Sequence, residues 1–235
     1  MNTDFNEKTQ AYLIIRWGRR LIDTFGDRGR EAFLFAARIY GETRGRRMAM
    51  RAIRDGKPLD LSSYLQYKEW VSTESMRDRG DANQASSSLS DNIYAKEVSR
   101  CPWNLQFTEM GETELGNLYC QVIDTSIAAG FSRSFTYQVP RNLNQGVPCR
   151  HVVENAGISA LPDSIHREYL KPFDYHCADL HFAFRRIVQS IFGDEGKAVT
   201  QQVEQDFRED CGEEMLLYLL SFAGTDFQTI SEDHE

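Results

Sequence analysis

The spacing of apolar residues changes along the chain, and this change limits the folds that the sequence can adopt. Apolar side chains recur at the helical period in four segments, residues 7–25, 29–54, 176–192 and 213–222. They alternate with a period of two, as in strands, in three central segments, residues 92–101, 135–139 and 147–153. Between the first two of these strands, residues 114–131 have the helical pattern again. The order along the chain is therefore helices, strand, helix, two strands and helices.

This order predicts an α+β fold, a small, mostly antiparallel sheet packed against helices, with N-terminal and C-terminal helical segments. Residues 1–71 form the N-terminal helical segment, which ends in a short helix over 61–71. Residues 72–91 are rich in serine, aspartate and glycine, so we expect an exposed, mobile loop there. Residues 92–235 then form the α+β core with its C-terminal helices, and the three segments are expected to make one compact unit.

Composition and charge argue against several classes of protein. Of the 235 residues, 41% are hydrophobic, which is enough for a sizeable core. The longest apolar run, LLYLLSFAG, has about half the length needed to cross a bilayer, and the first residues resemble no secretory leader. We therefore expect no membrane association and a cytoplasmic location. The net charge of −8 argues against nucleic acid as a partner, and the basic residues of the N-terminal third are expected to form a solvated helix face.

Cysteine is the residue type that most directly suggests chemistry. The chain has five cysteines and no C-x-x-C pair, which disfavours a disulfide framework and a zinc ribbon. On the helix predicted for 114–131, Asn117, Cys120 and Asp124 fall at i, i+3 and i+7 on one small, polar face. The carboxylate of Asp124 could then meet the Cys120 thiol or a shared water. The alternative is that Cys120 only packs as a small apolar side chain.

A second group lies on the last predicted strand. Cys149 and His151 are two residues apart, so they point to the same side of the sheet, whereas Arg150 points to the other. Cys101 ends the first strand, and short connections bring Cys101, Cys120, Cys149 and His151 toward one place. Such a set can provide a thiolate and imidazolium pair for nucleophilic catalysis, or four zinc ligands.

A third group opens the helix that follows residue 175. His176 and Asp179 share a helix face, and a carboxylate that fixes a histidine tautomer is a common device in active sites. The position of these residues at a helix N-terminus explains the acidic residue equally well, through capping and the helix dipole.

The middle of the chain resembles the L-2-amino-thiazoline-4-carboxylic acid hydrolase family. The resemblance rests on the segments CPW, ELGNLYCQVIDTSIAAGF and NLNQGVPCRHVV, within residues 92–156, so the N-terminal helices lie outside it. The positions that match the family pattern are Cys101 with Pro102, Cys120 with Asp124, and Gly146 with Cys149. The resemblance implies hydrolytic opening of a small cyclic amidine-like ring, a thiazoline carboxylate being opened to an N-carbamoyl amino acid.

These observations together predict a hydrolase with a small-molecule substrate and no cofactor, and they are compatible with a homo-oligomer. The expected catalytic residues are Cys120, Asp124, Cys101, Cys149 and His176, with Cys120 favoured as the nucleophile. The expected substrate-binding residues are His151, Asn117 and Asp179. The alternatives are a zinc ion held by Cys101, Cys120, Cys149 and His151, or a non-catalytic ligand-binding or sensor module with an aromatic-lined pocket.

Overall fold

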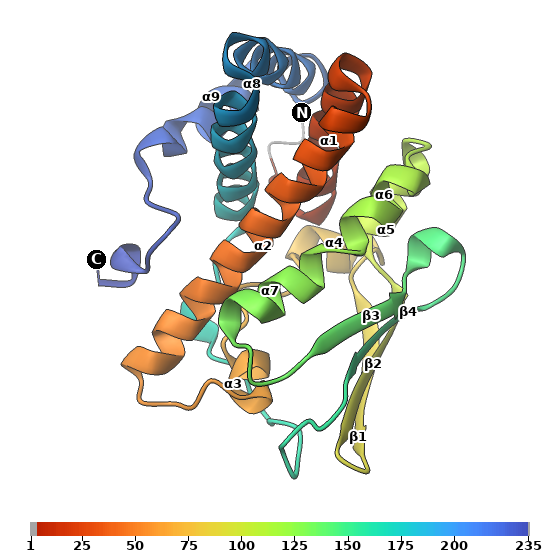
Figure 1. The fold of residues 1–235 in the computed structure, drawn as a ribbon, viewed down its shortest axis with the longest axis vertical. Helices are drawn as coiled ribbons and strands as arrows, with labels where there is room; N and C mark the ends of the chain where they lie inside the picture. Colours follow the sequence, from red (N-terminus) through yellow and green to blue (C-terminus); the bar gives the residue numbers. More distant parts are fainter. Residues whose placement is uncertain (1–3, 235) are drawn as a thin grey trace.

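The computed structural model describes residues 4–234, and its long N-terminal helices pack against the C-terminal ones (Figure 1). Helix α1 (Glu7–Phe25) begins with a capping box between Asn6 and Thr9, and helix α2 (Asp27–Arg54) follows after Gly26, whose φ of 58° lets the chain reverse. The predicted stripe of Leu13, Trp17 and Leu21 is fully buried. The predicted pair of N-terminal helices is therefore confirmed.

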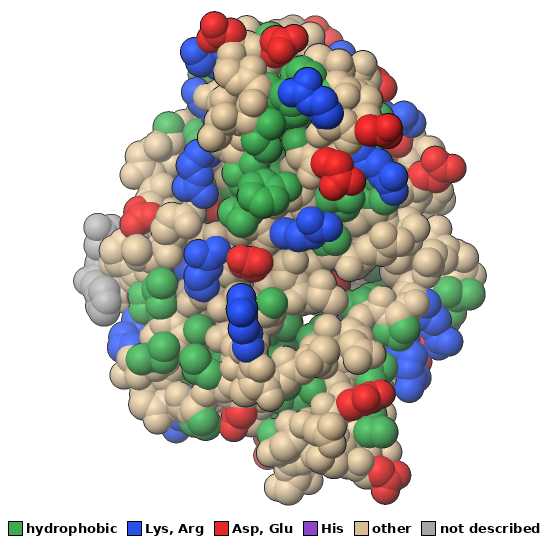
Figure 2. All heavy atoms as spheres, in the orientation of Figure 1, with side chains coloured by type: hydrophobic (Ala, Val, Ile, Leu, Met, Phe, Trp, Pro, Cys, Tyr) green, Lys and Arg blue, Asp and Glu red, His purple; other side chains and the backbone are tan. Residues whose placement is uncertain are grey.

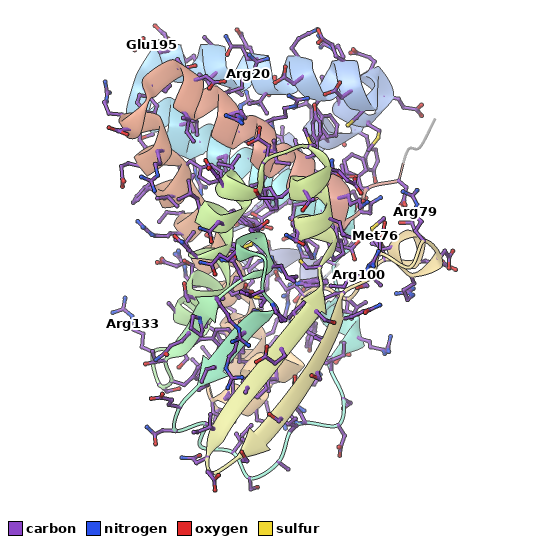
Figure 3. All side chains as sticks on the ribbon, turned by 90° about the vertical axis from the view of Figure 1, so that its right-hand side faces the viewer. Arg20, Met76, Arg79, Arg100, Arg133 and Glu195 are labelled. Carbon is purple, nitrogen blue, oxygen red and sulfur yellow. The ribbon has the colours of Figure 1, made fainter. Side chains whose placement is uncertain are left out.

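The sheet has four antiparallel strands in the order β1-β2-β4-β3. They are β1 (Gln84–Ser90), β2 (Ile93–Arg100), β3 (Tyr137–Arg141) and β4 (Cys149–Val153). The α+β class and the three predicted strands are confirmed, with ends shifted by one or two residues. One face of the sheet packs toward α7 and α2, and the opposite face is open, as the view in Figure 3 shows.

The prediction of a loop over 72–91 is wrong in its secondary structure. The segment contains helix α4 (Glu74–Asp78) and the edge strand β1, which forms a hairpin with β2. Most residues of β1 are exposed, so main-chain hydrogen bonds to β2 hold this strand, and a pattern of buried residues could not reveal it. Asp91 and Asn92, both with positive φ, form the two-residue turn of the hairpin.

Three short helices connect β2 to β3. They are α5 (Pro102–Glu109), α6 (Thr113–Cys120) and α7 (Ile123–Phe131). The single helix predicted for 114–131 is therefore interrupted at Gln121 and Val122. Helix α7 lies directly on α2, where Gly45 and Gly130 let the two backbones approach closely. This contact fixes the position of α7 between α2 and the sheet (Figure 1).

The first of the two C-terminal helices is longer than the apolar pattern predicts. Helix α8 (Phe173–Cys211) bends at Gly193 and continues through residues 194–211, and α9 (Glu213–Ser221) follows. The remaining short elements are α3 (Leu61–Gln66), η1 (Leu143–Gln145), η2 (Arg167–Tyr169), η3 (Phe222–Gly224) and η4 (Ser231–His234). Among residues 4–234, none of the helices has the length and apolar character to span a membrane.

The N-terminal basic residues do not all form a solvated face, which corrects the expectation from sequence. Arg44, Arg47 and Arg51 of α2 are buried, and Arg47 and Arg51 together donate three hydrogen bonds of 2.6–2.9 Å to the buried Glu69. On the surface shown in Figure 2, basic and acidic side chains are interspersed. The charges of Arg47 and Arg51 are therefore paired inside the helical layer.

Candidate active site

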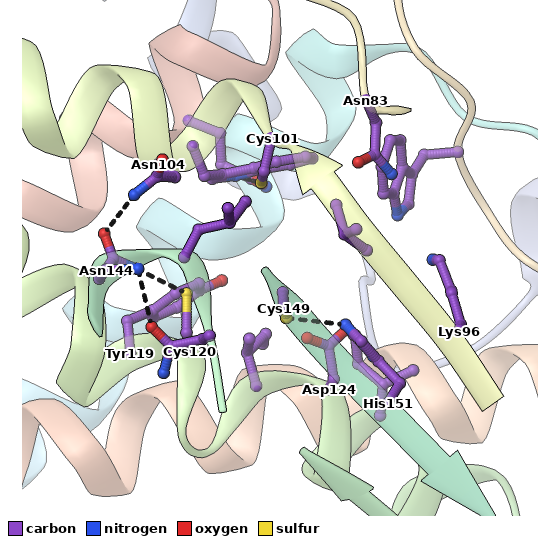
Figure 4. A pocket seen from close by; sticks show the side chains of 18 of the residues that line it. Asn83, Lys96, Cys101, Asn104, Tyr119, Cys120, Asp124, Asn144, Cys149 and His151 are labelled. Carbon is purple, nitrogen blue, oxygen red and sulfur yellow. Dashed lines mark hydrogen bonds between the residues drawn. The ribbon is translucent and has the colours of Figure 1, made fainter. Parts of the chain in front are cut away.

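The three cysteines that the sequence predicted to converge line one cavity. Cys101 lies where β2 joins α5, Cys120 ends α6 and Cys149 begins β4, and Figure 4 shows all three around a shared space. The cavity has a volume of about 110 Å³. Asp124 and His151 also line it. Elements that are short and consecutive in the sequence therefore bring their polar side chains to one site.

A hydrogen-bonded chain of three side chains runs along the wall formed by β3 and β4. Cys149 Sγ lies 3.1 Å from His151 Nε2, and His151 Nδ1 lies 3.0 Å from Tyr137 Oη. The period of two on β4 aims Cys149 and His151 inward, whereas Arg150 points to the open face and pairs with Glu97. The imidazole is therefore fixed at both nitrogens and in reach of the thiol proton.

In the resting state, the hydrogen-bonded side chains of Cys149 and His151 are both neutral. Burial raises the pKa of Cys149 to about 12, and burial lowers the pKa of His151 below its usual value, since it disfavours the charged form of each group. Near neutral pH the thiol therefore keeps its proton, and the neutral imidazole can accept it. A thiolate forms only as the proton is transferred, which is the arrangement of a nucleophile activated by an adjacent base.

Asp124 lies in the first turn of α7, beside the Cys149–His151 pair (Figure 4). Within residues 4–234 its carboxylate has no hydrogen-bond or ion-pair partner, so it is available to a ligand or a water. Its negative charge works against the burial of His151 by raising the pKa of the imidazole. Asp124 would therefore stabilise an imidazolium formed by proton transfer from the thiol.

The other two cysteines have different surroundings. Burial raises the pKa of Cys101 to about 11 and that of Cys120 well above its ordinary value. Asn144 Nδ2 lies 3.4 Å from Cys120 Sγ, and Asn104 Nδ2 donates to Asn144 Oδ1 at 3.0 Å. Neither thiol has a hydrogen bond to a histidine within the described residues. Of these thiols, Cys149 and not Cys120 therefore has a histidine base within hydrogen-bond distance.

The alternative predicted from the sequence was a zinc ion held by Cys101, Cys120, Cys149 and His151. Among residues 4–234, no three His, Cys, Asp or Glu side chains are grouped so that they could hold a metal ion. Cys149 and His151 are instead within hydrogen-bond distance of each other.

Three residues expected at the site lie elsewhere. His176 and Asp179 are buried on α8 beside the arginine cluster, where His176 Nε2 lies 3.1 Å from the Glu69 carbonyl oxygen and Arg47 Nη2 lies 2.8 Å from Asp179 Oδ2. Burial lowers the pKa of His176 to about 3, so it stays neutral. Asn117 accepts a hydrogen bond from Asn142 Nδ2 at 2.8 Å and is not part of the cavity wall. The alternative was that Asp179 only stabilises the helix N-terminus through capping and the helix dipole. It does not account for the contacts of Asp179, because this carboxylate forms an ion pair with Arg47.

Three residues of the site were not predicted from the sequence. Lys96 faces His151 across the β2–β4 pair, Tyr137 holds the imidazole, and Arg44 reaches the cavity from α2. Lys96 could have been recognised, because it takes an inward position in the alternating strand, between Tyr94 and Val98, which are both buried. Nothing in the sequence marks Arg44 apart from the other arginines of α2.

The comparison with known families covers the segments that carry Cys101, Cys120, Asp124 and Cys149. The sequence model described as L-2-amino-thiazoline-4-carboxylic acid hydrolase matches residues 6–151, more than half of the chain. The chain belongs to this family. The match begins in front of α1 and ends at His151, so the N-terminal helices are part of the thiazoline hydrolase region, contrary to the narrower resemblance seen from the motifs. No match was found among the curated proteins or the solved structures.

Proposed function

We propose that this chain is a hydrolase that opens a small cyclic amidine-like ring of the thiazoline-carboxylate type, with Cys149 as the nucleophile and His151 as its base. The observation that carries the proposal is the 3.1 Å contact between Cys149 Sγ and His151 Nε2 in the wall of the cavity. Membership in the thiazoline carboxylate hydrolase family supports the class of substrate.

In the first half of the proposed reaction, Cys149 Sγ attacks the amidine carbon while its proton moves to His151 Nε2. The bond between that carbon and the ring sulfur then breaks, and the ring sulfur takes the proton from His151 and leaves as a thiol. The carbon remains bound to Cys149 in an isothiourea. The charge of Asp124 stabilises the imidazolium in between.

In the second half, water adds to the isothiourea carbon and gives a proton to His151. The bond to Cys149 breaks, and the thiolate recovers the proton from His151. The product is an N-carbamoyl amino acid, and one water has been consumed for each ring opened. Asp124 lies beside both groups, which supports a role for its carboxylate in orienting this water.

The test is a ring-opening assay with 2-amino-thiazoline-4-carboxylate on the purified protein. Cys149→Ser and His151→Gln are expected to reduce turnover about a hundredfold or more, in the range of lost general-base catalysis. Cys211→Ser is the matched control, because Cys211 ends α8 and is not part of the cavity wall. Equal loss of activity in the control would contradict a specific role for Cys149.

Two further measurements separate the alternatives. Mass spectrometry of acid-quenched enzyme should find the adduct on Cys149, and an adduct on Cys120 would move the nucleophile to α6. Elemental analysis showing one zinc per chain would replace the covalent route by metal-activated water. A wild-type protein that binds thiazoline carboxylates without turnover would instead be a small-ligand-binding or sensor module.

A further inference from the structure

The cavity holds two cationic side chains that the proposed chemistry does not use. Arg44 enters from α2 and Lys96 from β2, and both also line an adjoining cavity of about 510 Å³. Asp124 is shared by the two cavities as well. The two cations therefore lie at the junction between the small cavity with its cysteines and a larger space.

Arg44 is buried with only a long ion pair and no hydrogen bond for its guanidinium. Only 6% of the residue is exposed, and the guanidinium has no hydrogen-bond acceptor among residues 4–234. Within residues 4–234 it forms one ion pair, with Glu69, whose Oε2 lies 3.7 Å from Arg44 Nε, beyond hydrogen-bond distance. The carboxylate of Glu69 is already occupied by Arg47 and Arg51. Because a buried guanidinium without hydrogen bonds is costly, an anion that binds in the cavity and accepts hydrogen bonds from Arg44 would stabilise it.

Lys96 adds a second charge next to the reacting groups. It is the direct cross-strand partner of His151, and its ammonium has no ion-pair partner within the described part of the chain. Directly opposite residues of an antiparallel pair have their Cβ atoms about 5 Å apart. An anionic group held by Lys96 therefore lies close enough to the Cys149–His151 pair for a single small ring to reach from one to the other.

We propose that Arg44 and Lys96 bind the carboxylate of the substrate and thereby select carboxylate-bearing rings over neutral ones. The proposal rests on the proposed function and names the residues that recognise the substrate. Arg44 offers a planar pair of donors that matches a carboxylate, and Lys96 offers a point charge from the opposite wall. With the carboxylate at the junction, the ring lies in the small cavity beside Cys149.

The kinetic test compares 2-amino-thiazoline-4-carboxylate with 2-amino-thiazoline, which lacks the carboxylate. The wild type is expected to prefer the carboxylate substrate, and Arg44→Gln and Lys96→Gln are expected to raise KM for it about 10- to 100-fold. The loss of kcat/KM for the neutral ring should be at least about fivefold smaller than the loss for the carboxylate ring, so the preference falls. Lys96→Gln remains informative if Arg44→Gln does not fold, since Lys96 lies outside the buried arginine cluster. Arg46→Gln, which removes a neighbouring exposed charge, should behave as the wild type.

A binding test keeps this proposal separate from the catalytic one. Thiazolidine-4-carboxylate has no amidine carbon to attack, and its binding can be followed by the fluorescence of Trp70 and Trp103, which line the cavity. The wild type is expected to bind thiazolidine-4-carboxylate more tightly than thiazolidine, and both variants are expected to lose this difference. That result would support carboxylate binding by Arg44 and Lys96 even if no ring is opened. Equal binding of the two probes by the wild type, or equal losses for both in the variants, would overturn it.

Discussion

The close contact between α2 and α7 allows a test of how the fold positions the site. A Cβ atom added at Gly45 would lie 1.9 Å from the Ile127 carbonyl oxygen, which is about 1.5 Å shorter than the 3.4 Å of ordinary contacts. The atom it meets belongs to the α7 backbone, so no change of rotamer can relieve the overlap. Gly45→Ala must therefore push α7 away from α2.

The size of the effect follows from this overlap. Forcing extra volume into a packed interior costs about 1–3 kcal/mol, which for a chain of this size lowers Tm by roughly 2–12 °C. A displacement of α7 on the order of 1 Å also moves Asp124, which lies in its first turn. A misplacement of this size can cost about a hundredfold in turnover.

The assay pairs a thermal melt with the ring-opening measurement. Gly224→Ala is the matched control, because Gly224 has no positive φ and a Cβ there would meet no atom within 4 Å. The control should keep both Tm and activity. A Gly45→Ala protein that melts within about 1 °C of the wild type and keeps full turnover would refute the argument that α2 fixes α7.

Three other predictions concern single groups. Asp124→Asn should keep Tm within a few degrees while turnover falls about a hundredfold, and an early melt with proportionate activity would make Asp124 structural. Because burial lowers the pKa of His151, and only the neutral imidazole accepts the thiol proton, the acid limb of kcat/KM should lie below pH 6.5; a limb above 6.5 would contradict this. Glu69→Gln should leave the buried arginines unneutralised, which costs about 3–5 kcal/mol and roughly 6–20 °C in Tm. The exposed pair member Glu42 gives the control, because Glu42→Gln should shift Tm by less than about 2 °C.

Local patterns were sufficient for much of the fold. The apolar stripe of α1 and the alternation along β2 and β4 depend on neighbouring residues, so they can be read without knowing the tertiary structure. The edge strand β1 could not be found in this way, because its exposed serines carry no burial pattern. Its one local signal is the Asp91-Asn92 turn.

The candidate site, too, was predicted only in part from local sequence patterns. Cys149 and His151 are two residues apart on one strand, so the strand geometry alone places them together, as the sequence predicted. His176 was expected at the site from its neighbours on α8, yet the helix turns it toward Glu69. A helix face is polar or apolar by its own sequence, but its partner is chosen by the whole fold.

The sequence by itself therefore determined the α+β class, the helical ends, the inward pair on β4 and the family resemblance, because each depends on residues close together in the chain. Only the tertiary structure decided that Arg47 and Arg51 donate hydrogen bonds to Glu69 while Arg44 makes only a long ion pair with it. These arginines carry the same charge and lie on one helix, so nothing local distinguishes them. Their roles differ because the anions and the cavity are supplied by segments far away in the sequence.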